Sequence, residues 1–421
     1  MVPTINASGW RGARIVALVA VLLTISGTGG ALALVPSAVH AQTPIPVATP
    51  DAFYDAPETV PAEPGVLLRA EPFTRDVPAA ARAWRILYTT TRDDGIPALA
   101  SALVVAPANP DEHALPVIAW THGTTGVAAA CAPSLLDAPF AAAGLHALDQ
   151  ILGEGWAVVA TDYVGQGTPG PHPYLIGQGA ARSALDAVRA ARQLDDLALA
   201  EQTVVWGHSQ GGHAALWTGA LAPGYAPDVN VLGVAALAPA TDLVTQLSQL
   251  QVSPFGTIIT AFVVDAYSRI YPDVAFDDIV RPEARGIAAQ IARLCISGAM
   301  DPDAQALGAL LEQLDGGILT PDAARGPLGA RLAENTPRNP IPAPLLIAQG
   351  LDDDLVLPEI TASFVAERCA GGQEIAYRTY AGRGHGSLVT ADSPVYADLI
   401  AWTRDRFTGA TPPSGCETGA A

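Results

Sequence analysis

Two patterns of hydrophobic residues recur along this chain. Apolar runs of six to eight residues, typical of strands buried on both faces, recur through it. They are Leu115–Trp120, Gly155–Thr161, Val231–Leu237 and Pro342–Ala348, with the shorter run Val204–Trp206 between them. Residues 180–197 instead space their apolar side chains as a helix does, and Val395–Phe407 also reads as a helix. Strands that alternate with helices predict an α/β protein, with a mostly parallel sheet flanked by helices.

Other elements are predicted on either side of this pattern. Residues 84–91 and 98–105 are separated by Asp93-Asp94-Gly95, which indicates an antiparallel hairpin. Residues 42–64 are rich in proline and alanine and are predicted to form an extended N-terminal arm. Near the C-terminus, residues 374–380 form a further predicted strand.

The pattern of apolar residues changes after Ala240. Residues 241–340 are largely helical in pattern and separate two predicted strands, which indicates a helical cap inserted between core segments 65–240 and 341–421. The apolar stretch 253–271 fits two interpretations, an ordinary buried helix or a helix that faces substrate. In the second, the substrate-lining side chains are Phe255, Ile259, Phe262 and Val263. Such a cap could also contact a lipid interface transiently.

The first 41 residues have the pattern of an export signal. Arg11 and Arg14 precede an apolar segment, and small residues end at Ala41, after which cleavage is predicted. Ile15–Val35 is also long enough to span a bilayer, so a membrane-anchored form stays open. In either case the body of the protein is expected outside the cytoplasm, and a secreted form is predicted.

The charge is strongly negative. The formal net charge is -19, and all 22 basic residues are arginine. Removal of residues 1–41, which carry two positive charges and no negative ones, makes it -21. Such a surface repels nucleic acid, so no nucleic-acid partner is expected. The sequence leaves the oligomeric state open.

The segment around Ser209 carries the clearest chemical signal. Residues 207–212 read GHSQGG, directly after a strand and before an alanine-rich helix. Strand, sharp turn and helix are the context of a G-x-S-x-G nucleophile elbow. Gly207 and Gly211 let strand and helix approach closely, and the backbone N–H of Gln210 is predicted to point at a developing oxyanion.

A serine nucleophile needs a histidine base, and that base needs an acid to orient it. His385 has the late position and the glycine-flanked loop expected of the base. Among the acids at 352–354 we choose Asp353 from its spacing to Gly350 and Val356. The neighbouring carboxylates are expected to raise its pKa.

A second oxyanion donor is expected after the strand 115–120. We favour Thr124, whose hydroxyl could add a further hydrogen bond. The chain contains no metal-binding motif and no nucleotide-binding fingerprint, so neither a metal nor a cofactor is predicted.

The chain has four cysteines, and an even number in an exported protein suggests two disulfides. They are Cys131, Cys295, Cys369 and Cys416. From the residues alone, all three pairings remain possible.

Together these segments resemble the secretory lipase family, of the fungal lipase A type with bacterial relatives. The resemblance extends over residues 65–407. Its motifs are WTHGTTG at 120–126, CAPS at 131–134, TDYVGQG at 161–167, HPY at 172–174, LDAVRA at 185–190, GHSQGG at 207–212, QG at 349–350, Asp353, Val356 and GH at 384–385.

The resemblance implies an α/β-hydrolase fold with a helical cap inserted before the acid strand. It also implies hydrolysis of acyl esters, commonly acylglycerols, by Ser209, Asp353 and His385. The disulfides that it implies are Cys131–Cys295 and Cys369–Cys416.

The function predicted from the sequence is that of a secreted serine hydrolase that cleaves carboxylic esters through an acyl-enzyme. Its expected substrate is a small-molecule or lipid ester, and the expected class is triacylglycerol lipase or carboxylesterase. Two alternatives stay open, because a fold does not fix a function. One is a peptidase or acyltransferase on the same scaffold, and the other is an inactive extracellular binding protein.

Overall fold

The computed structural model describes residues 50–109, 113–250, 253–296, 302–411 and 415–420. The predicted export signal, its cleavage after Ala41, the span Ile15–Val35 and the start of the N-terminal arm lie outside these residues. Within the described ranges, no helix has both the length and the apolar character needed to cross a membrane.

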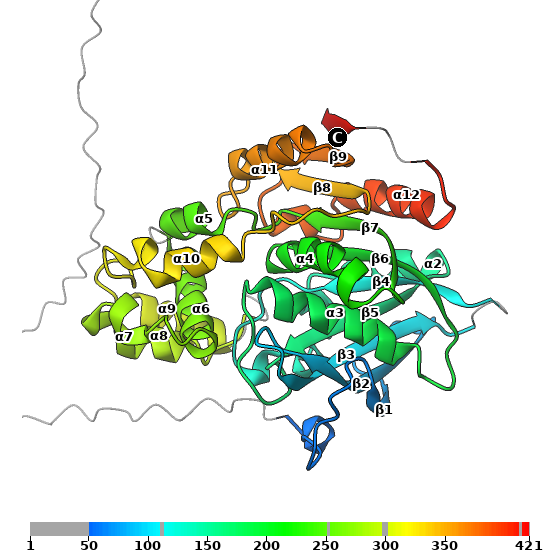
Figure 1. The fold of residues 1–421 in the computed structure, drawn as a ribbon, viewed down its shortest axis with the longest axis horizontal. Coiled ribbons are helices and arrows are strands. Elements are labelled where there is room, and N and C mark those ends of the chain that lie inside the picture. Colours follow the sequence, from blue (N-terminus) through cyan, green and yellow to red (C-terminus); the bar gives the residue numbers. More distant parts are fainter. Residues whose placement is uncertain (1–49, 110–112, 251–252, 297–301, 412–414, 421) are drawn as a thin grey trace, which may run out of the picture. The chain divides into compact units, whose positions relative to one another are not determined.

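The described strands form one ten-stranded sheet in the order β1-β2-β3-β5-β4-β6-β7-β8-β9-β10 (Figure 1). Strands β1, β2, β3 and β5 pair antiparallel, and every pair from β5 to β10 is parallel. The bounds are β1 Leu67–Phe73, β2 Ala81–Thr91, β3 Pro97–Pro107, β4 Leu115–Thr121, β5 Ala157–Val164, β6 Leu199–His208, β7 Asn230–Leu237, β8 Leu345–Gly350, β9 Ile375–Tyr380 and β10 Cys416–Ala420. The predicted α/β class is therefore confirmed.

Helices cover both faces of this sheet because both faces are apolar. In β4, Val117 and Ala119 belong to the same core cluster as side chains of α3, α4 and α11. Their neighbours Ile118 and Trp120 belong to the opposite cluster, with side chains of α2 and α12. This is the alternation that a two-sided buried strand requires. The covering helices are α1 Pro139–Ala142, α2 Leu148–Gly153, α3 Gly177–Ala191, α4 Gln210–Tyr225, α11 Pro358–Ala370 and α12 Val395–Phe407.

Two elements end elsewhere than the sequence pattern predicts. Strand β5 continues past Thr161 to Val164, because Tyr163 and Val164 pair with β3 beyond a register shift. Helix α3 ends at Ala191, although the apolar pattern runs to Leu197. Leu194 and Leu197 are buried in the core after the helix has ended, so their apolar character reflects packing of the following turn.

The segment between β7 and β8 forms a helical layer with a core of its own. Its helices are α5 Leu243–Leu250, α6 Pro254–Ile270, α7 Phe276–Ile279, α8 Arg285–Ile291, α9 Pro302–Leu311 and α10 Pro327–Glu334. Their buried apolar side chains, Phe262 and Leu328 among them, make a third cluster. Figure 1 shows these helices gathered together beside the sheet, where the sequence predicts a cap.

The described part of the N-terminal arm is not simply extended. A short 3-10 helix, Ala52–Tyr54, buries Phe53 and Tyr54 against Leu87 and Leu99. The hydroxyl of Tyr54 is also within 2.8 Å of Ser134 Oγ. The arm is thus attached to the antiparallel side of the sheet by two aromatic side chains.

The four cysteines form two disulfides, which confirms the prediction of disulfide bonding. Cys131 pairs with Cys295, and Cys369 pairs with Cys416, as the family resemblance implies. The first bridge connects the segment after β4 to the cap. The second connects α11 to β10 at the edge of the sheet.

Candidate active site

Ser209 has a backbone conformation that residues other than glycine rarely adopt, with a φ of 58°. It follows the last residue of β6 and immediately precedes α4. The turn is possible because Gly207 and Gly211, two positions before and after the serine, have no side chain. A Cβ on Gly207 would lie 2.1 Å from the Gly211 carbonyl oxygen, and one on Gly211 would lie 1.9 Å from that of Thr121. The predicted elbow is therefore present, with the serine at the carboxyl edge of the sheet.

His385 and Asp353 are brought to this serine from far along the chain. His385 Nε2 is 2.8 Å from Ser209 Oγ, and His385 Nδ1 is 2.9 Å from Asp353 Oδ2. Asp353 follows β8, and His385 follows β9. Both strands are parallel to β6, so their carboxyl ends meet at one edge.

The carboxylate of Asp353 is buried and fully hydrogen-bonded. Its Oδ1 accepts the backbone N–H groups of Leu355 and Val356, at 3.0 and 2.8 Å. Its Oδ2 accepts from the side-chain amide of Gln349 at 3.1 Å as well as from His385. Asp352 and Asp354 are exposed, in contrast. Of the three aspartates, only Asp353 is placed to orient the histidine.

The expectation that neighbouring carboxylates raise the pKa of Asp353 is wrong. Burial does act to raise this pKa, but the hydrogen bond and charge of His385 outweigh it, together with the N–H groups of Val356 and Leu355. The net result is a pKa below the ordinary value for aspartate. Because Asp352 and Asp354 are directed into solvent, screening weakens their effect on the buried group.

The acid loop and the histidine loop are attached to each other through their backbones. The N–H of Asp352 donates to the carbonyl of Arg383 at 2.9 Å, and that of Leu351 donates to Tyr380 at 3.0 Å. Gly350 permits this approach, because a Cβ there would lie 2.3 Å from the Arg383 oxygen. The distance between acid and base is therefore set by main-chain contacts.

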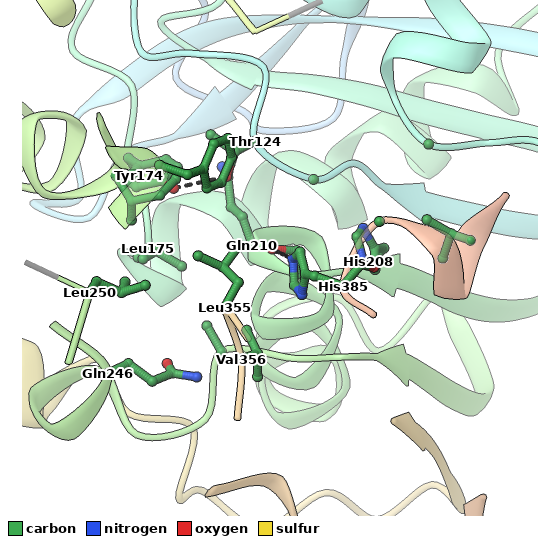
Figure 2. A pocket seen from close by; sticks show the side chains of 18 of the residues that line it. Thr124, Tyr174, Leu175, His208, Gln210, Gln246, Leu250, Leu355, Val356 and His385 are labelled. Carbon is green, nitrogen blue, oxygen red and sulfur yellow. Dashed lines mark hydrogen bonds between the residues drawn. The ribbon is translucent and has the colours of Figure 1, made fainter. Parts of the chain in front are cut away.

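The two predicted oxyanion donors come from different segments, one at the start of α4 and one after β4. Gln210 is the first residue of α4, where backbone N–H groups have no intrahelical acceptor. Thr124 follows β4, and its hydroxyl is 2.8 Å from the hydroxyl of Tyr174. Both line the same cavity as Ser209 and His385. Figure 2 shows Thr124 beside Tyr174, with Gln210 between them and His385.

The side chain of Gln210 has a fixed orientation that the sequence does not reveal. His172 Nδ1 is 3.2 Å from the carbonyl of Val164, so this nitrogen carries the proton and donates. His172 Nε2 therefore accepts from Gln210 Nε2 at 3.0 Å. Burial, followed by the charge of His122, lowers the pKa of His172 to about 3, which keeps the ring neutral. Gln210 Oε1 is then left buried, with no partner in the described part of the chain.

A cavity of about 280 Å³ opens beside these groups. Ser209 and His385 lie in its wall together with apolar side chains of the cap. From α6 these are Phe255, Ile259 and Val263, which are four residues apart and so share one helix face.

Phe262 was predicted to line this site, and it does not. Its side chain is fully buried inside the cap and meets the ring of Tyr174 edge-on, with centroids 5.8 Å apart. A rotation of about 100° per residue separates it from Val263, so the two point in different directions. Helix α6 therefore has one face toward the cavity and the rest in the cap core, and contact of that face with a substrate stays a prediction.

Metal binding finds no support in the parts of the chain that are described, since no three His, Cys, Asp or Glu side chains there group as ligands would. The chemistry available is instead that of a hydroxyl, an imidazole and a carboxylate in a row, beside a helix N-terminus. Such an arrangement can activate a serine for attack on a carbonyl carbon.

The sheet order, the elbow and the order serine, acid, histidine along the chain define an α/β-hydrolase. The chain belongs to the secretory lipase family, whose model matches residues 136–415. The resemblance seen in the sequence is thereby confirmed, and the protein is of the lipase or esterase type.

The curated relatives include a probable inactive lipase and secreted triacylglycerol lipases. One is a probable inactive lipase of Mycobacterium tuberculosis, 27% identical over 85% of this chain and 82% of the relative. Another is a secreted triacylglycerol lipase of Malassezia globosa, 27% identical over 79% of this chain and 74% of its own length.

Solved structures share the fold. Candida antarctica lipase A superimposes with a TM-score of 0.75 at 20% identity, over 90% of each chain. The rice cell wall degrading esterase LipA from Xanthomonas oryzae superimposes with a TM-score of 0.65 at 20% identity, over 82% of this chain and 98% of the other. At such identities the likeness concerns the fold.

Proposed function

We propose that this protein is a secreted serine hydrolase that cleaves lipid or small-molecule acyl esters through a covalent acyl-enzyme. One observation carries the proposal. Ser209 Oγ, His385 and Asp353 form an unbroken hydrogen-bonded row, with contacts of 2.8 and 2.9 Å. The names of relatives such as the secreted triacylglycerol lipase support a lipid ester as substrate and export from the cell.

In the proposed reaction, His385 Nε2 takes the proton of Ser209 as the hydroxyl attacks the ester carbonyl. Asp353 holds His385 in the tautomer that leaves Nε2 free to accept. The carbonyl oxygen becomes an oxyanion, which the N–H of Gln210 and a donor at Thr124 stabilise. His385 then returns the proton to the leaving alcohol. In the second half of the reaction, water attacks the acyl-enzyme with His385 as base, the carboxylic acid leaves, and Ser209 regains its proton.

The cavity wall fits this substrate class. Apolar side chains from α5 and α6 face the space next to Ser209. Burying one side-chain-sized apolar group is worth about 1.5–3 kcal/mol, so a fatty portion gains affinity there. A peptide substrate would bring backbone N–H and C=O groups against this wall and leave them without partners.

The experiment that tests the proposal combines labelling with turnover. A fluorophosphonate probe should label the protein, and the Ser209→Ala variant should remain unlabelled while keeping its circular dichroism spectrum. Turnover is then measured on p-nitrophenyl esters from acetate to palmitate and on emulsified triglyceride. Absence of both labelling and hydrolysis would instead favour a binding protein without activity. One relative is named as a probable inactive lipase, which supports keeping this alternative.

A further inference from the structure

One polar side chain lies among the apolar side chains that α5 and α6 contribute to the cavity wall. Gln246 lies on α5 and is buried, with 5% of its surface exposed. Leu243 and Leu250 are three and four residues away from it, on the same face of the helix, and Leu247 is the next residue in the sequence. All four residues line the cavity, where Figure 2 labels Gln246 and Leu250.

The side-chain amide of Gln246 has no hydrogen-bond partner among the described residues, and its Nε2 is fully buried. Other polar residues of this helix are satisfied or solvated. Thr245 donates to the carboxylate of Asp242, Ser248 donates to the carbonyl of Thr245, and Gln249 is exposed. A buried amide without a partner lowers the free energy of unfolding. A leucine or methionine would fill the same place without that cost.

Gln210, the other cavity-lining glutamine with an unpartnered buried atom, differs in one respect. Its amide nitrogen is held by His172, so only its oxygen lacks a partner. Among the described residues, no hydrogen bond fixes either end of the Gln246 amide. With either assignment of its oxygen and nitrogen, this amide brings both a donor and an acceptor to the wall.

We propose that Gln246 recognises an oxygen on the fatty portion of the substrate, so that the site selects oxo- or hydroxy-substituted acyl esters over plain alkyl ones. This inference rests on the proposed function. A keto oxygen along the bound chain would accept from the Gln246 amide. A plain alkyl chain in the same position would cover the amide and leave it without a partner, which is the type of mismatch that gives strong discrimination.

The test compares matched esters on matched variants. The substrates are p-nitrophenyl octanoate and the p-nitrophenyl esters of oxo-octanoic acids with the keto group at successive positions. Octyl acetate and oxo-octyl acetates place the same oxygen on the alcohol side. The variants are Gln246→Met, which keeps the length of the side chain, and Gln249→Met, an exposed glutamine of the same helix, as control.

The unmodified protein should prefer one oxo-octanoate over octanoate by at least about tenfold in kcat/KM. Gln246→Met should remove this preference and raise kcat/KM for octanoate, and Gln249→Met should change neither. The melting temperature of Gln246→Met should equal or exceed that of the parent, because an unsatisfied group is removed. A purely structural role for Gln246 would lower it.

Equal preference by the parent and Gln246→Met, on an enzyme that hydrolyses octanoate, would overturn this inference and leave the proposed function intact. A preference confined to the oxo-octyl acetates would overturn the assignment to the acyl side. If the parent hydrolyses none of the esters and is not labelled by the fluorophosphonate, the proposed function fails and this inference fails with it.

Discussion

The ring of His208 packs against the ring of His385, with centroids 4.7 Å apart, and its Nε2 donates to the backbone carbonyl of His385 at 3.1 Å. Burial, and after it the charge of His385, lowers the pKa of His208 to about 3. His208 is therefore neutral and supports the loop of His385 without adding a charge beside it. It precedes Ser209 directly, so one residue of the elbow restrains the proposed base.

His208→Asn should consequently reduce kcat by about tenfold to a hundredfold and change KM little, because the loop of His385 loses a restraint on its position. Steady-state kinetics on p-nitrophenyl butyrate measures both constants. His113→Asn, at an exposed position, is the control. An unchanged kcat in folded His208→Asn protein would show that the loop holds His385 without this contact.

Asp353→Asn should lower turnover by about 10⁴, because the amide favours the wrong tautomer of His385. Asp352→Asn and Asp354→Asn should have little effect, since both side chains are exposed. Initial rates of the three variants at the same protein concentration provide the measurement. Sensitivity at 352 or 354 would place the acid one residue away from our assignment.

Val263→Phe should fill part of the cavity and reduce kcat/KM for palmitate far more than for acetate, because Val263 lines it. Phe262→Leu is the matched change inside the cap core. It should cost about 1–2 kcal/mol of stability and leave the ratio of palmitate to acetate unchanged. Equal losses on both esters with Val263→Phe would make α6 a scaffold and not a substrate wall.

Removal of the Cys131–Cys295 bridge should destabilise the protein more than removal of Cys369–Cys416. The bridged cysteines are 164 residues apart in the first case and 47 in the second. In the chain-entropy model the longer loop contributes about 5 kcal/mol, roughly 1 kcal/mol more than the shorter. Urea unfolding of the two double Cys→Ser variants should reveal this order, and the reverse order would contradict it.

Asp93 should make stability fall as the pH rises through the mildly acidic range. Burial raises the pKa of this carboxyl to about 6, against the opposing effects of the Gly179 N–H and Arg182. The ordinary value in an unfolded chain is about 3.9. Since the folded pKa is the higher one, the folded protein binds more protons than the unfolded chain between these values, so stability falls from pH ~4 to pH ~6 and stays at the lower level above that.

Asp93→Asn should thus be more stable than the parent above pH ~6, by about 1–2 kcal/mol after allowance for partial exposure, and should match it near pH ~4. Asparagine keeps an oxygen for the Gly179 N–H, which donates to Asp93 at 2.6 Å. Melting temperatures across this pH range provide the measurement, with exposed Asp137→Asn as control. A pH-independent difference would exclude titration of Asp93 as the cause.

Much of the architecture is determined by local patterns in the sequence. Continuous apolar runs predict strands buried on both faces, and the glycines around Ser209 predict the elbow, since both depend on neighbouring residues alone. The register from Gly350 was enough to choose Asp353 among three aspartates. The position of the helical insertion before the acid strand also follows from the order of elements.

The tertiary structure decided what depends on residues far apart in the chain. The helical period of α6 separates Phe262 from Val263, but only packing within the cap and against Tyr174 determines which face meets the cavity. The pKa of Asp353 is lowered by His385 and by N–H groups of the folded loop. The adjacent aspartates in the sequence give no sign of these partners and suggest a raised pKa instead. The contacts of His208 with His385 and of Gln210 with His172 join residues 177 and 38 positions apart. Hydrogen bonds of this kind follow from how the chain folds back on itself, and no local pattern encodes them.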